Sequence, residues 1–204
     1  MTRNPFIFCI FLLALAGCSL SPRDTGAAYL FSLSPVTGAP PPKPVPLRLG
    51  VAFPSAAPEL DTARIALRRA DGDWDYYAGA RWADFLPVMV HDNIVKTIEN
   101  TRVFASITGE PGPSSDDILK VEIRAFEADY RGNPDAPTVR VRLALTLLDH
   151  RQAKTIGSFG AESTAKAGRD SLPALAAAFQ KAFAAAEKQA VSALAQTAFA
   201  APAQ

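Results

Sequence analysis

Two segments of this chain alternate apolar and polar residues over most of a long strand. In the first, apolar residues at 119, 121, 123 and 125 are separated by Lys120, Glu122 and Arg124, and the same pattern covers 139–147. Side chains of a strand point alternately to its two faces, so each segment has one buried face and one face in water. Gly132-Asn133-Pro134 provides a turn between them. The pattern predicts a pair of antiparallel strands that are covered on one face.

Several shorter segments also have the composition of strands. In 47–53, leucine, valine and phenylalanine alternate with arginine, glycine and alanine, and 64–69 is followed by the turn Asp71-Gly72-Asp73. That turn predicts a hairpin between 64–69 and 74–78. The strands predicted outside the long pair cover residues 29–33, 47–53, 64–69, 74–78, 103–107 and 154–165.

Two segments have the three- and four-residue spacing of apolar residues that is typical of amphipathic helices. The first starts near Asp84, a suitable cap, and has Pro87 in its first turn, where a missing N–H is tolerated. The second is rich in alanine, follows a capping Ser171 and has Pro173 at an early position. Their apolar sides comprise Trp82, Leu86, Met89, Val90, Ile94 and Ile98 in the first helix, and Leu172, Leu175, Phe179, Phe183 and Leu194 in the second.

The order of these elements predicts the fold class. Strands, a helix, further strands and a final helix indicate an α+β protein, a two-layer sandwich in which a mostly antiparallel sheet packs against two helices. Residues 35–46 hold many prolines, which cannot pair inside a sheet, so we expect a loop there. We therefore expect one domain over 28–199, followed by a frayed tail at 200–204.

The start of the chain has the pattern of a bacterial lipoprotein signal peptide. Arg3 provides a positive charge, and the apolar run that follows is shorter than the ~20 residues of a membrane-spanning helix. Leu15-Ala16-Gly17-Cys18 ends the run with small residues before a cysteine. We expect residues 1–17 to be removed and Cys18 to carry acyl chains, palmitate among them. The alternative is an ordinary secretory signal with a chance cysteine.

Residues 18–27 are expected to form a lipidated tether. Several acyl chains hold a protein on a membrane durably, whereas a single chain binds only marginally. Serine rather than aspartate follows the cysteine, and in the sorting rule of enteric bacteria this favours the outer membrane. We therefore expect a lipid-anchored protein of the cell envelope, at the outer membrane and facing the periplasm.

Charge and cysteine content argue against several classes of protein. Loss of Arg3 with the signal leaves 21 − 1 = 20 basic residues against 20 acidic ones. This balance argues against nucleic-acid binding. Cys9 leaves with the signal and Cys18 is acylated, so no thiol remains for a disulfide or a metal site.

The sequence contains none of the common catalytic or cofactor motifs. It lacks the nucleophile elbow G-x-S-x-G, a Walker loop, the dinucleotide-binding glycine pattern and H-E-x-x-H. His91 and His150 adjoin Asp92 and Asp149, but neighbours on a helix or strand point in different directions. We expect neither pair to form a proton relay, and we expect no metal, no cofactor and no enzymatic activity.

Aromatic and arginine residues are concentrated around 74–82. Tyr76, Tyr77 and Arg81 have side chains that protein interfaces favour, so they are candidate partner-binding residues, with packing inside the domain as an equal alternative. Trp82 is expected in the core. The arginines on polar strand faces either meet an acidic partner or form ion pairs in water. They are Arg48, Arg64, Arg68, Arg140 and Arg142.

Four motifs of the chain match those of one known family. They are the motif that ends at Cys18, YLFSL at 29–33, LDTARIALR at 60–68 and YYAGARWAD at 76–84, which leads into the first helix. On these motifs the chain resembles the ABC-type transport auxiliary lipoproteins, the family that includes the PqiC-type lipoprotein. The resemblance extends over about the whole chain after Cys18.

The resemblance implies a role in transport. Members of the family are expected to act with lipid-trafficking ABC systems in which an MCE-domain protein bridges the periplasm, and to dock that bridge at the outer membrane. The implied fold is similar to the N-terminal domain of TolB. Two alternatives stay open: an outer-membrane lipoprotein that activates a peptidoglycan synthase or another envelope enzyme, and a carrier that binds a lipid between sheet and helices. A third, an enzyme, stays open only if the structure brings His91 or His150 to a carboxylate in a cleft.

Overall fold

The computed structural model describes residues 29–38 and 43–200, so the predicted signal peptide, tether and last four residues lie outside the described residues. The helices and strands are β1 (Tyr29–Phe31), β2 (Val45–Val51), β3 (Ser55–Ala56), β4 (Arg64–Arg68), β5 (Trp74–Trp82), α2 (Leu86–Thr101), β6 (Phe104–Thr108), β7 (Asp117–Asp129), β8 (Thr138–Asp149), β9 (Lys154–Lys166) and α3 (Leu172–Ala200).

Strand β7 lies at the centre of one sheet that contains all of these strands. One edge of β7 pairs antiparallel with β8 along its length, and β8 pairs in the same way with β9. The other edge of β7 pairs in turn with β2, β3 and β4, and all three run parallel to it. Strand β6 extends the sheet beyond β2, while β5 and β1 extend it beyond β4.

The sheet is therefore mixed, and the prediction of a mostly antiparallel sheet was wrong. Strands β2, β3 and β4 follow one another along the chain and keep one direction, and the chain reaches β7 only after it has passed through α2 and β6. Parallel pairing requires a connection of this kind, which crosses back before the next strand begins. Local alternation identifies the strands, but these connections determine the direction in which they pair.

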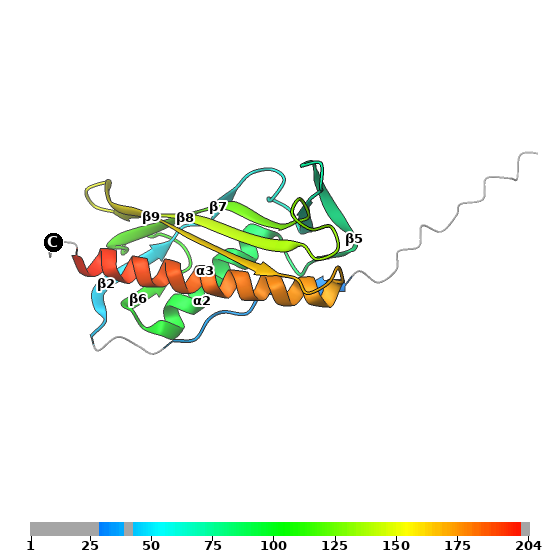
Figure 1. Ribbon diagram of the computed structural model, residues 1–204. Coiled ribbons are helices and arrows are strands. Elements are labelled where there is room, and N and C mark those ends of the chain that lie inside the picture. The colour runs from blue at the N-terminus through cyan, green and yellow to red at the C-terminus, as the bar shows by residue number, and fades with distance from the viewer. Residues whose placement is uncertain (1–28, 39–42, 201–204) are drawn as a thin grey trace, which may run out of the picture.

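Both helices pack on the same face of the sheet, and the α+β class is confirmed. Helix α3 runs along β8 and β9, and α2 lies beside β6 (Figure 1). Ile98 of α2 and Leu194 of α3 meet Leu119 and Leu145 of the sheet around one narrow space. The two-layer description and the likeness to the TolB N-terminal domain stay predictions.

Four fully buried aromatic side chains hold α3 on the sheet. The ring centre of Phe179 lies 5.0 Å from that of Trp82 and 5.5 Å from that of Phe126. The ring centre of Phe183 lies 5.8 Å from that of Phe126. Since Trp82 belongs to β5 and Phe126 to β7, this aromatic cluster fixes the helix to two strands that are distant in the sequence.

Trp82 is buried as predicted, but it ends a strand instead of starting the first helix. Strand β5 turns at Gly79, whose φ of 67° suits glycine, and continues to Trp82. Helix α2 starts only at Leu86, with Phe85 as its N-cap, so the prediction of Asp84 as the cap was wrong. The Asp84 carboxylate instead accepts a hydrogen bond from the backbone N–H of Phe85, at 2.7 Å.

The proline-rich segment is tied to the domain at both of its described ends. The backbone N–H of Val36 donates to the hydroxyl oxygen of Thr97 on α2, at 2.9 Å. Val45 and Pro46, which the sequence places in the loop, belong to β2. Pro46 is exposed where the register between β2 and β6 breaks, a position at which a missing N–H is tolerated.

Candidate functional site

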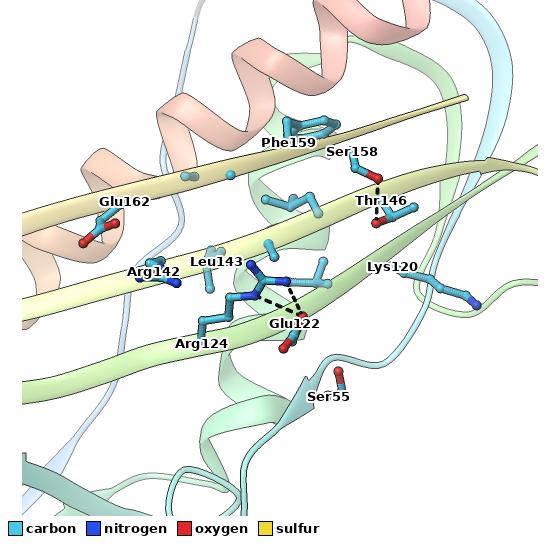
Figure 2. A pocket seen from close by; sticks show the side chains of 15 residues that line it. Ser55, Lys120, Glu122, Arg124, Arg142, Leu143, Thr146, Ser158, Phe159 and Glu162 are labelled. Atoms are coloured by element: carbon cyan, nitrogen blue, oxygen red, sulfur yellow. Dashed lines mark hydrogen bonds and ion pairs between the residues drawn. The ribbon is translucent and has the colours of Figure 1, made fainter. Parts of the chain in front are cut away.

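The face of β7, β8 and β9 that points away from the helices forms a hollow (Figure 2). Its volume is about 800 Å³, and it is open to solvent. Small side chains form the floor, and charged side chains from all three strands stand around it. Two rows of paired residues cross it: Glu122–Ala144–Gly160 and Lys120–Thr146–Ser158.

A β-bulge shapes one side of the hollow. The register between β7 and β8 shifts between Ile123 and Ala125, so Arg124 has no partner residue on β8. A bulge bends its strand and redirects the side chain of the extra residue. The guanidinium group of Arg124 donates two hydrogen bonds to Glu122, at 3.1 and 3.0 Å, which hold both side chains at the rim (Figure 2).

Positive charge exceeds negative charge around the hollow. Lys120, Arg124 and Arg142 provide three cations, while Glu122 and Glu162 provide two anions. Arg142 lies opposite Glu162 in the register of β8 and β9, yet none of the ion pairs between described residues includes Arg142. An exposed guanidinium group of this kind can pair with a carboxylate of another molecule. The hollow thus suits a polar surface that carries an acidic side chain.

The hollow continues past β7 toward β3. A second space of about 500 Å³ is lined by Ser55, Ala56 and Ala57 on one side and by Glu122, Arg124 and Arg142 on the other. The uncovered face therefore presents one continuous polar surface across four strands.

The three predicted partner-binding residues do not line this hollow. The guanidinium carbon of Arg64 lies 3.6 Å from the ring centre of Tyr76. The hydroxyl of Tyr77 is hydrogen-bonded to that of Tyr130, and burial raises the pKa of Tyr77. Arg81 is exposed. Both tyrosines are thus packed against neighbours within the domain, and Arg81 is the one of the three whose side chain is free to meet another molecule.

The arginines on the polar strand faces differ in their partners. Arg48 donates to both carboxylate oxygens of Asp116, at 3.1 and 3.0 Å, which lowers the pKa of Asp116 to about 2. Arg140 donates to Glu127 at 3.1 and 2.8 Å. These two arginines therefore form ion pairs within the domain, whereas Arg142 at the hollow remains available to a partner.

His91 contacts its neighbour Asp92, contrary to expectation. Its Nδ1 atom lies 3.2 Å from a carboxylate oxygen of Asp92. Its Nε2 atom donates to the carbonyl oxygen of Gly109, at 2.6 Å, and so joins α2 to the segment after β6. His150 is exposed, whereas its neighbour Asp149 is buried. His91 therefore has both ring nitrogens engaged in contacts that support the fold.

Within 29–38 and 43–200, no three histidine, cysteine, aspartate or glutamate side chains gather in a way that could hold a metal ion. Over those residues, no helix combines the length and the hydrophobicity needed to cross a bilayer.

Two spaces between the sheet and the helices are too small for a lipid. One lies between Ile94, Leu119 and Leu194, and the other adjoins Trp82 and Phe179; each measures about 10 Å³. Sites for small molecules measure roughly 300–1,000 Å³. At these two places the described side chains fill the interior, which argues against the lipid-carrier alternative.

Asp117 is a fully buried acid at the start of β7. Neither of its carboxylate oxygens has a hydrogen-bond partner among the described residues, and it pairs in register with Asp149. Burial, followed by the negative charges of Asp149 and Asp116, raises the pKa of Asp117 to about 6.

We expect Asp117→Asn to increase the free energy of unfolding at neutral pH. Because the folded-state pKa is raised from 3.8 to about 6, the stability that this group contributes is fully present below 3.8 and is lost as the pH rises through 6. Urea unfolding below pH 3.8 and above pH 6 measures the effect. The difference in the free energy of unfolding between these two pH values should be smaller in Asp117→Asn than in the wild type, and an unchanged difference would contradict the prediction.

The comparisons with known proteins agree with this structure. The family model described as ABC-type transport auxiliary lipoprotein component matches residues 29–191. Protein XCC0632 from Xanthomonas campestris is similar in structure, with 27% identity and a TM-score of 0.74 over 82% of this chain and 95% of that one. No curated protein matches the chain.

Two further solved structures show the fold alone. An uncharacterized protein has 15% identity and a TM-score of 0.62, and the match covers 83% of this chain and 97% of that one. The hypothetical protein CT253 from Chlamydia trachomatis has 8% identity and a TM-score of 0.50, with 76% of this chain and 99% of that one covered.

Proposed function

Because the chain belongs to the ABC-type transport auxiliary lipoprotein family, we propose that it is the docking subunit of a lipid-transporting ABC system. In this proposal it catalyses no reaction. It binds the MCE-domain protein that bridges the periplasm and holds the end of that bridge at the outer membrane. The family match over residues 29–191 supports the transport role.

The observation that carries the docking role is the hollow on β7, β8 and β9. It is a polar surface that neither helix covers, with a floor of small side chains and an unpaired Arg142 at its rim. Interfaces that form and dissociate are about as polar as other protein surfaces, and arginine is enriched among the residues that dominate their affinity. We expect an acidic side chain of the MCE-domain protein to pair with Arg142 while its neighbours fill the space over Gly160.

Lipidation of Cys18 is the second part of the proposal. Acyl chains confine the domain to the bilayer surface, so that a bridge reaching this surface meets a high local concentration of docking sites. Affinity at each hollow can then be modest, because anchoring replaces part of the binding free energy that a protein in free solution would need.

We expect Gly160→Gln to weaken binding of the MCE-domain protein about tenfold. A Cβ atom at Gly160 would have the carbonyl oxygen of Leu143, at 3.8 Å, as its nearest neighbour, so the larger side chain fits the fold and occupies the hollow. Thr164→Gln is the matched control, since Thr164 is exposed on the same strand but does not line the hollow. The dissociation constant is measured with lipidated protein in detergent and the purified MCE-domain protein of the same bacterium.

Arg142→Glu tests the charge of the same surface without altering its floor. It should weaken binding as well, and increasing salt should reduce the difference between the variant and the wild type. Equal affinities for the wild type, Gly160→Gln and Arg142→Glu would exclude the hollow as the docking surface. Failure of the wild type itself to bind would exclude the MCE-domain protein as the partner.

A further inference from the structure

A row of exposed side chains crosses the sheet at the strand nearest to the predicted anchor. Leu30 of β1 pairs with Arg81 of β5, and Arg81 pairs with Arg64 of β4. Residues directly opposite one another in neighbouring strands point to the same face. Leu30 is 58% exposed, and both arginines are exposed as well. We call these three residues the anchor-side row.

The two arginines of the anchor-side row are available to an external anion. Neither takes part in an ion pair with another described residue. Arg64 lies over the ring of Tyr76, with 3.6 Å between its guanidinium carbon and the ring centre, a contact that helps to hold its side chain in place. A planar guanidinium group that is held in this way can form paired hydrogen bonds with a phosphate.

Strand β1 adds an exposed apolar side chain beside these two arginines. Leu30 is an apolar residue of β1 that points to the same face as Arg81, and among the described strands β1 pairs with β5 alone, at an edge of the sheet. Exposed apolar residues on an edge strand favour unwanted association unless something covers them. Arginine side chains beside an exposed leucine suit the headgroup region of a bilayer, because the apolar stem of arginine lies among apolar groups while its charged end reaches the phosphates.

The position of β1 in the chain places it close to the predicted anchor. Tyr29 follows Cys18 by 29 − 18 = 11 residues, which span at most about 40 Å even if fully extended. The other end of the sheet, where the turn between β8 and β9 lies, is the far end of the domain from β1 (Figure 1). If Cys18 is fixed in a bilayer, β1 is the described strand with the shortest chain connection to that surface.

We propose that the anchor-side row rests on the lipid surface, with Leu30 at the headgroup level and Arg81 and Arg64 on lipid phosphates. This contact orients the domain so that the opposite end of the sheet extends into the periplasm. The proposal rests on the lipidated anchor of the proposed function, but it does not depend on the identity of the protein partner.

The test measures how close each end of the domain lies to the bilayer. Lipidated protein is reconstituted into vesicles of phosphatidylethanolamine and phosphatidylglycerol that contain a headgroup spin label. A fluorophore is attached at Ser32→Cys, next to β1, or at Gln152→Cys, in the turn between β8 and β9; both positions are exposed. With Cys18 acylated, the introduced cysteine is the one free thiol of the processed chain.

We expect quenching at position 32 to exceed quenching at position 152 several-fold, and Arg81→Glu or Leu30→Asp to reduce that ratio. Lys188→Glu, an equal change of charge on the exposed side of α3, should leave it unaltered. Equal quenching at both positions would overturn the proposal, since the domain would then tumble freely on its tether. The proposal would also be overturned if the label at position 32 lost its accessibility only when the MCE-domain protein was added. The anchor-side row would then be a contact with that protein.

Discussion

Phe179→Ala is expected to lower the free energy of unfolding by about 3–5 kcal/mol, a large part of the total stability of a domain of this size. Phe179 is 1% exposed, packs edge-on against Trp82 and stacks on Phe126. The substitution removes the apolar surface of a whole ring and leaves a cavity between α3 and two strands that can collapse only in part. Because α3 covers β8 and β9, its partial release would expose the core of the sheet.

Urea unfolding followed by tryptophan fluorescence measures this effect, since Trp82 is buried beside the substituted ring. Phe199→Ala is the matched control, because Phe199 lies near the end of the same helix and is 51% exposed. The control should change the free energy of unfolding by less than ~1 kcal/mol. If the two variants lost the same stability, the aromatic cluster could not be what holds α3 on the sheet.

Glu187→Gln is expected to stabilise the protein at and above neutral pH, and to remove most of the pH dependence that this glutamate causes. Glu187 points from α3 into the core and is 1% exposed. One carboxylate oxygen accepts a hydrogen bond from the hydroxyl of Thr97, at 3.2 Å, and the other has no partner among the described residues. Burial raises the pKa of Glu187 to about 8, and the bond from Thr97 opposes this rise only in part.

The direction of the pH effect follows from the raised pKa. Between 4.5 and about 8, the folded state keeps a proton on Glu187 that the unfolded state releases. The stability contributed by this group is therefore fully present below pH 4.5 and is lost as the pH rises through 8. The loss over the window is at most about 5 kcal/mol, from the usual free energy for each unit of pKa.

The measurement is the free energy of unfolding across this pH range for the wild type and for Glu187→Gln. Glutamine keeps an acceptor for Thr97 and cannot ionise, so its curve should be flatter and should lie above the wild type at alkaline pH. Glu99→Gln removes an exposed carboxylate and serves as the control. Parallel curves for wild type and Glu187→Gln would contradict the assignment of a neutral, buried carboxyl group.

Most strands were predictable because their signal is local. The long strands β7, β8 and β9 lie where alternation predicts them, and each extends only a few residues beyond the predicted bounds. Strand β3 was not predicted, because the pair Ser55–Ala56 is too short to show any alternation. The strand directions were not predictable either, since they depend on how the chain crosses between β4, α2 and β7.

Glu187 shows a signal that was present but overlooked. It follows Phe183 by four residues and precedes Leu194 by seven, so the helical spacing already put it on the apolar side of α3. A glutamate on that side predicts a buried acid. The spacing could not show that Thr97 of α2 would be its hydrogen-bond partner, because that contact joins residues far apart in the chain.

The candidate site was predictable only in part. The outward positions of β7 and Arg142 on β8 were identified as a polar face from alternation alone. Ser158 and Gly160 were not singled out, because small residues in a strand give no sign of whether they lie under a helix or form the floor of a hollow. That distinction depends on which face of the sheet the two helices cover, and it is a property of the packed domain.

The identity of the proteins that the lipidated chain retains in its own membrane tests the docking role most directly. The measurement is a pull-down from detergent-solubilised membranes, with the wild type and Cys18→Ala compared and the partners identified by mass spectrometry. We predict that an MCE-domain protein is recovered with the wild type and that its recovery falls with Cys18→Ala. Recovery of a peptidoglycan synthase without any MCE-domain protein would contradict the transport role and support an envelope-enzyme activator instead.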